Sequence, residues 1–128
     1  MKVLALDYGS ARTGVAVSDA TGTLARPLEV VSRITEDAGL GRLDALVGEH
    51  EPELVLVGLP LTLRGEIGAQ ADETLAFVAR LRDRLDVPVE TWDERLTTTL
   101  AQQSGHRAPE DARAAAHLLQ SWLDRGAR

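Results

Sequence analysis

The chain opens with a short apolar run that ends in an acidic residue, and this combination restricts the fold more than any other stretch. Val3 to Leu6 is nearly unbroken apolar sequence, which is typical of a strand covered on both faces. Side chains alternate along a strand, so Asp7 shares one face with Val3 and Ala5. A carboxylate at the end of a buried strand must be neutralised, paired or bound to a cation, because burying a bare charge is costly.

A tight turn and a second strand follow. Gly9 and Gly14 flank the turn and allow close backbone approaches that a Cβ would block, and Val15 to Val17 starts the next strand. Asp7 can therefore also be a turn cap that accepts hydrogen bonds from nearby backbone amides. For an isolated Asp-x-Gly sequence both interpretations stay open, and the rest of the chain must decide between them.

Length and composition predict a single domain over residues 1–128 that works in the cytoplasm. A chain of 128 residues is long enough to bury one real core. No apolar run could span a membrane, the apolar start is too short for a signal peptide, and the lack of cysteine excludes disulfides and thiolate metal sites. The formal net charge of −6 argues against a broad nucleic-acid-coating surface but leaves room for a local basic patch.

The spacing of apolar residues predicts three strands, then a helix, a strand, a helix, a strand and two further helices. After the first two strands we expect a strand over 22–31, a helix with Thr35 as its N-cap, a strand over 54–57, a helix over 67–85 whose apolar stripe begins at Ile67, a strand over 87–92 and a last helix over 109–124. Pro27 and Pro88 cannot donate to a strand ladder, so their two strands are expected at sheet edges.

Polar residues follow two of these strands, at the end where open α/β sheets tend to bind ligands. Arg64 lies in the loop after the fourth strand, and Asp93, Glu94 and Arg95 follow the fifth. The plain alternative for the loop is a simple strand-to-helix connection. For the second group the alternative is an N-terminal helix cap in which Arg95 pairs with one of the two acids.

The last helix carries a third acidic position. Asp111, Ala115, Leu118 and Trp122 follow one another at spacings of four, three and four residues, which places them on one stripe of a helix. Asp111 is therefore expected in the first turn, at the rim of the packed side. The alternative is an acid that only complements the helix dipole, a role for which Glu110 is equally well placed.

Taken together, these motifs resemble the YqgF family, also called RuvX, of ribonuclease H-like nucleases. Each motif is short, but they occur in the same order over nearly the whole chain. The matching segments are Leu6-Asp7-Tyr8-Gly9 with Arg12, Gly14 to Asp19, Val57-Gly58-Leu59-Pro60 with Gly65, Asp93 to Thr98, and Asp111 followed by Ala114-Ala115 and Leu118-Leu119-Gln120.

The resemblance implies an α/β ribonuclease H-like fold, with a five-stranded mixed sheet whose first three strands form an antiparallel meander and with helices on both faces. It implies a cytoplasmic nuclease that matures the 5′ end of pre-16S ribosomal RNA, and some members of the family are described instead as Holliday-junction resolvases. In the family pattern Asp7, Asp93, Glu94 and Asp111 are the candidate catalytic acids.

Phosphodiester hydrolysis needs an activated water and charge relief on the phosphate, and two hard cations about 4 Å apart can supply both. Carboxylates without Cys or His suit Mg²⁺ or Mn²⁺. The expected ligands are Asp7, Glu94 (or Asp93) and Asp111, and without metal at least one clustered carboxyl should titrate high. The residues expected to hold the substrate are Gly9, Arg12, Arg64, Arg95 and Thr97.

One segment departs from the family pattern, and two other classes of protein remain as alternatives. The stretch 100–110 is shorter than expected and its basic character rests on His106 and Arg107, which bears on the grip on substrate. An ATP-binding protein of the actin-like superfamily also carries Asp-x-Gly between strands, but it needs two such domains. A non-catalytic module that binds RNA or a ribosome-associated protein also stays open, because the net charge is acidic and the basic segment is short. The expected partners are nucleic acid, RNA over branched DNA, and ribosomal precursor particles. For the oligomeric state, monomer and homodimer both stay open.

Overall fold

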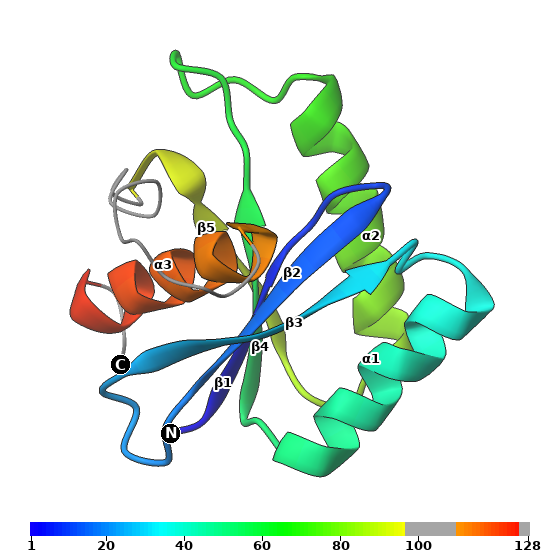
Figure 1. The fold of residues 1–128 in the computed structure, drawn as a ribbon. Coiled ribbons are helices and arrows are strands. Elements are labelled where there is room, and N and C mark those ends of the chain that lie inside the picture. Colours follow the sequence, from blue (N-terminus) through cyan, green and yellow to red (C-terminus); the bar gives the residue numbers. More distant parts are fainter. Residues whose placement is uncertain (97–109, 126–128) are drawn as a thin grey trace.

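The computed structural model describes residues 1–96 and 110–125 and builds one mixed sheet in the order β3-β2-β1-β4-β5 (Figure 1). The strands are β1 (Val3–Asp7), β2 (Arg12–Ser18), β3 (Ala25–Ser32), β4 (Leu54–Leu59) and β5 (Val89–Asp93). The first three strands are antiparallel neighbours, whereas β4 runs parallel to β1 and to β5. The carboxyl ends of β1, β4 and β5 therefore meet at one edge of the sheet, which confirms the expected arrangement.

Helices cover both faces of this sheet, also as expected (Figure 1). The helices are α1 (Asp37–His50), α2 (Ala69–Arg84) and α3 (Glu110–Arg125), and the short 3₁₀ helix η1 (Glu94–Leu96) follows β5. Leu4 and Leu6 of β1 pack with α1 and α2, whereas Val3 and Ala5 pack with α3. Because its side chains alternate in direction, β1 contributes to two hydrophobic cores, one on each face of the sheet. The same alternation places Asp7 on the face covered by α3.

The start of α1 differs from the prediction. The N-cap is Glu36 rather than Thr35, and its side chain makes no capping hydrogen bond. Thr35 lies instead inside a turn closed by the Glu36 amide, which donates to the carbonyl of Arg33 at 3.0 Å. Gly39 is needed here, because a Cβ at this position would lie 2.4 Å from the Arg33 carbonyl oxygen.

Two other boundaries also differ from the prediction. Ile67 is not part of α2, which begins at Ala69 after the N-cap Gly68, and its side chain is 59% exposed. The strand β3 begins at Ala25 rather than residue 22, because the Asp19 carboxylate accepts hydrogen bonds from two amides of the preceding turn. The edge positions of β3 and β5 are confirmed, and the ladder between β2 and β3 shifts register beside Pro27.

None of the helices in residues 1–96 and 110–125 is long and apolar enough to cross a membrane.

Candidate active site at the carboxyl edge of the sheet

Asp7 ends the central strand β1, and the start of α3 approaches it closely across β2. Asp7 is half-buried and is the partner of Gly14 in the β1–β2 ladder. A Cβ on Gly14 would lie 1.9 Å from the backbone oxygen of Asp111. The first turn of α3 can therefore pack on β2 beside Asp7 only because Gly14 has no side chain.

Glu94 reaches the same place from the other side. It follows β5 as the first residue of η1, and its side chain crosses the end of β4 at Gly58. A Cβ on Gly58 would lie 2.7 Å from Glu94 Oε2 and 2.3 Å from Leu118 Cδ1. Gly58 thus leaves room for the Glu94 side chain, whose carboxyl group is hydrogen-bonded to the carboxyl group of Asp7.

The sequence did not predict this role of Gly58, which was identified only as part of the Val57-Gly58-Leu59-Pro60 motif. The available signal was a glycine inside an otherwise fully apolar strand, which often marks the close approach of another group.

The two carboxyl groups share a site that disfavours two negative charges. Burial, together with the charge of Asp111, raises the pKa of Asp7 from its ordinary 3.8 to about 6, although the hydrogen bond to Glu94 acts in the opposite direction. Burial, then the charge of Asp7 and the hydrogen bond to it, raise the pKa of Glu94 from 4.5 to about 7. The pair therefore shares a proton at pH values at which an isolated Asp or Glu would already have lost it.

The Asp111 carboxylate forms an ion pair with an arginine of β2. Arg12, the first residue of β2, places its Nε 3.1 Å from Asp111 Oδ2, and the two side chains are 69% and 33% exposed. Arg12 was expected to hold a substrate phosphate, and here it stands at the rim of the carboxyl pair. The structure thus brings Asp7, Glu94, Asp111 and Arg12 to one edge of the sheet.

Asp93 does not join this group. Its carboxylate accepts hydrogen bonds from the Arg95 amide at 2.9 Å and from Arg95 Nε and Nη2, the latter at 2.7 Å. This guanidinium lowers the pKa of Asp93. The alternative of a cap paired with Arg95 therefore describes Asp93, whereas Glu94 is the acid that meets Asp7.

Two of the other predicted substrate residues, Gly9 and Arg64, lie around the same edge. Gly9 forms the turn after β1, where its amide donates to Thr13 Oγ1 at 3.4 Å and a Cβ would lie 2.5 Å from the Arg12 oxygen. Arg64 is exposed in the loop after β4. Thr97 and most of the segment 100–110 lie outside the described residues.

The acidic side chains at this edge, Asp7, Glu94 and Asp111, are suitable ligands for a hard cation, because Mg²⁺ and Mn²⁺ prefer carboxylate oxygens. Within residues 1–96 and 110–125, however, no three His, Asp or Glu side chains already form a group placed to hold a metal ion. In this structure Asp111 is paired with Arg12, and Asp7 and Glu94 are hydrogen-bonded to each other. Two carboxyls that share a proton are a site that a divalent cation can neutralise.

Relatives of known name are similar to this chain along its whole length. A protein of Desulforamulus reducens is 38% identical over 137 residues, with all of both chains covered, and one of Rhodococcus erythropolis is 44% identical, with 98% of this chain and 78% of the relative covered. Both carry the provisional name of pre-16S rRNA nuclease.

Solved structures of two resolvases share the fold. The Thermus thermophilus RuvC protein in complex with a Holliday junction substrate has a TM-score of 0.59 at 23% identity and covers 99% of this chain and 97% of its own. The resolvase of fowlpox virus, solved with Holliday junction DNA, has a TM-score of 0.60 at 10% identity, with both chains fully covered.

These likenesses agree with the ribonuclease H-like sheet and layers expected from the sequence. The family model described as "RuvX: Holliday junction resolvase" matches residues 1–125. Together with the full-length identity to named relatives, this match shows that the chain belongs to the RuvX family.

Proposed function

We propose that this protein is a metal-dependent nuclease whose single ribonuclease H-like domain hydrolyses a phosphodiester bond at the carboxyl edge of the sheet. The observation that carries the proposal is the hydrogen-bonded pair of Asp7 and Glu94, with the charge of Asp111 beside it. Membership of the RuvX family supports the same reaction class. The names of the relatives favour pre-16S rRNA as the substrate. Cleavage at the 5′ end of this RNA, in the cytoplasm and on ribosomal precursor particles, is part of the proposal.

Asp7, Glu94 and Asp111 are the proposed ligands of Mg²⁺ or Mn²⁺, with Asp7 shared if two ions bind. A bound divalent ion would supply charge relief on the attacked phosphate and a water of lowered pKa. The chain's own residues prepare this site in two ways. Glu94 would release to solvent the proton that it shares with Asp7, and Asp111 would be free to bind the ion once its carboxylate leaves Arg12.

Arg12, Arg64, Gly9 and Thr97 are the proposed contacts of the substrate phosphates. Arg12 has a direct reason for this role, because once it leaves Asp111 its guanidinium stands at the rim of the site with its fork of donors available. The proposal places Asp93 outside the metal ligands, because its carboxylate is committed to Arg95.

The test is cleavage of a 5′-extended 16S rRNA precursor and of a four-way DNA junction, each with Mg²⁺, with Mn²⁺ and with EDTA. Wild type would be compared with Asp7→Asn, Glu94→Gln and the control Asp44→Asn, which removes an exposed acid paired with Arg84 far from the site. We expect metal-dependent cleavage of the RNA, lost in the two site variants and kept in the control.

Cleavage of the junction alone would make the protein a resolvase, a function that the family description also favours. Metal-independent cleavage, or cleavage by Asp7→Asn, would overturn the proposed site. Binding of RNA without cleavage of either substrate, unchanged in Asp7→Asn, would show a non-catalytic binding module.

A further inference from the structure

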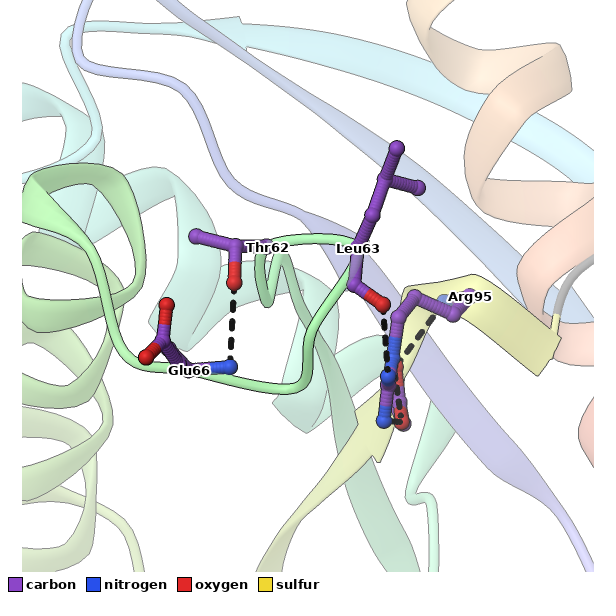
Figure 2. Close-up of polar contacts among 5 residues, drawn as sticks. Thr62, Leu63, Glu66 and Arg95 are labelled. Carbon is purple, nitrogen blue, oxygen red and sulfur yellow. Dashed lines mark hydrogen bonds and ion pairs between the residues drawn. The ribbon is translucent and has the colours of Figure 1, made fainter.

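The residue Arg95 links two segments of the site that are more than thirty positions apart in sequence. Its Nη1 donates to the carbonyl oxygen of Leu63 at 3.4 Å, while Nε and Nη2 bind both oxygens of Asp93 (Figure 2). A planar guanidinium can bind a carboxylate through two fixed donors and still donate to a carbonyl with its third nitrogen, whereas a lysine ammonium has no such fork.

The segment on one side of this bridge is a compact turn, residues 62–66. The Gly65 amide donates to the Thr62 carbonyl at 2.8 Å, the Thr62 amide to the Glu66 carbonyl at 3.0 Å, and the Glu66 amide to Thr62 Oγ1 at 3.0 Å. Gly65 has a φ of +82°, and a Cβ at this position would lie 3.2 Å from Arg95 Nη1. The turn therefore has a fixed shape, and Arg95 lies against its glycine.

The turn is also placed to meet a ligand. Leu63 directs its side chain away from Arg95 and is 95% exposed, and Arg64 beside it is exposed as well (Figure 2). An exposed apolar side chain next to an exposed cation, at the carboxyl edge of the sheet, suits contact with a nucleic-acid strand.

Glu94 lies at the other end of this bridge, between Asp93 and Arg95, which are hydrogen-bonded to each other. The Asp93 carboxylate accepts from the Arg95 amide at 2.9 Å, so the backbone that carries Glu94 is closed into a tight turn. The Glu94 side chain then passes over Gly58 to the Asp7 carboxyl. Any shift of the Asp93–Arg95 unit moves this carboxyl relative to Asp7.

We infer that Arg95 is a positioning residue that couples the position of the 62–66 turn to the position of the Glu94 carboxyl group. A nucleic-acid strand bound to Leu63 and Arg64 would then hold this carboxyl group in its reactive place beside Asp7. This inference rests on the proposed function and reassigns Arg95 from direct phosphate contact to the link between substrate grip and the reacting groups. Loss of this link should lower the rate at saturating substrate, since a misplacement of about 1 Å can reduce catalysis about 100-fold.

The kinetic test compares Arg95→Gln, Arg95→Lys and Arg64→Gln on the substrate that wild type cleaves. For Arg95→Gln we expect kcat to fall by about 10-fold or more with KM close to wild type, and for Arg64→Gln the reverse. Arg95→Lys keeps the charge but loses the fork, so it should resemble Arg95→Gln. A rise in KM alone for Arg95→Gln, or full rescue by lysine, would return Arg95 to direct phosphate binding and overturn the inference.

A second measurement needs no cleavage and therefore separates this inference from the proposed function. Amide hydrogen exchange of the metal-free protein would be followed in Arg95→Gln and in Gly65→Ala. Coupling between sites is reciprocal, so Arg95→Gln should accelerate exchange at the Gly65 and Glu66 amides, and Gly65→Ala should accelerate it at the Arg95 amide. Changes confined to the mutated segment, with an unaltered global stability, would show two independent loops.

Discussion

The carboxyl groups of Asp7 and Glu94 are hydrogen-bonded to each other, although the two residues are 87 positions apart in the sequence. Asp7 ends β1 and Glu94 directly follows β5, and these two strands are not neighbours in the sheet. The strand between them, β4, ends with Gly58 and Leu59, and only the missing side chain of Gly58 lets the two groups meet. Several consequences of this contact can be measured.

Stability should fall as the pH rises through the titration of the pair. Both folded pKa values are raised, to about 6 and about 7, so the folded state binds more protons than the unfolded one above pH 3.8. The stabilising contribution is complete below that pH and is lost as the pH passes 6 to 7. Asp7→Asn removes one charge, so it should be more stable than wild type at pH 8 by on the order of 1 kcal/mol, with little difference at pH 4.

Urea unfolding in EDTA at pH 4 and pH 8 measures this difference. Asp44→Asn serves as the control for loss of one carboxyl, since it removes a member of an exposed ion pair between α1 and α2. A wild type that is as stable as Asp7→Asn at pH 8 would show that the pair does not repel.

Gly58→Ala should separate the two carboxyls. The new Cβ would lie 2.3 Å from Leu118 Cδ1 and 2.7 Å from Glu94 Oε2, so both side chains must move. We expect a loss of about 1–3 kcal/mol of unfolding free energy and a loss of cleavage activity. The matched control is Gly48→Ala in α1, where a Cβ meets nothing within 4 Å and should stabilise by roughly 0.5–1 kcal/mol. Thermal unfolding and an activity assay check both; an active Gly58→Ala enzyme would contradict the geometry.

Gly14→Ala should detach the start of α3 from the sheet. The Cβ would lie 1.9 Å from the Asp111 oxygen, which is backbone and cannot rotate away. We expect a loss of more than about 3 kcal/mol, because relief requires a shift of the helix that packs against β1, β2 and β3. Gly41→Ala, with open space around its Cβ, is the control. Equal denaturation midpoints for the two variants would be the contrary result.

Arg12→Gln should affect ion and substrate binding in opposite directions. The ion pair with Asp111 is largely exposed, so its removal should change stability by less than about 1 kcal/mol. Without the competing guanidinium, Asp111 becomes available to a divalent ion, and Mn²⁺ affinity measured by calorimetry without substrate should increase. The KM for nucleic acid should rise, because a phosphate contact is lost. Weaker Mn²⁺ binding by Arg12→Gln would mean that Arg12 supports the ion site rather than competing for it.

Most of the architecture follows from local patterns along the chain. The apolar run before Asp7, the alternation along β1 and the prolines at residues 27 and 88 were enough to predict two covered faces and two edge strands. These features are local, because periodicity and proline chemistry act through the residue's own backbone and its nearest neighbours. Element boundaries near Thr35 and Ile67 were predicted wrongly, because turns that compete for the same backbone amides decide where a helix begins.

Which acids meet depends on contacts between segments that are far apart in the chain. Asp93 and Glu94 are adjacent and chemically alike, so no local pattern separates them. Arg95 binds the carboxylate of Asp93 and keeps it away from Asp7. Gly58 leaves space for the Glu94 side chain to cross the end of β4 and reach Asp7. Contacts between segments that are distant in the chain depend on the exact spacing of packed elements, and a single Cβ is enough to allow or forbid them.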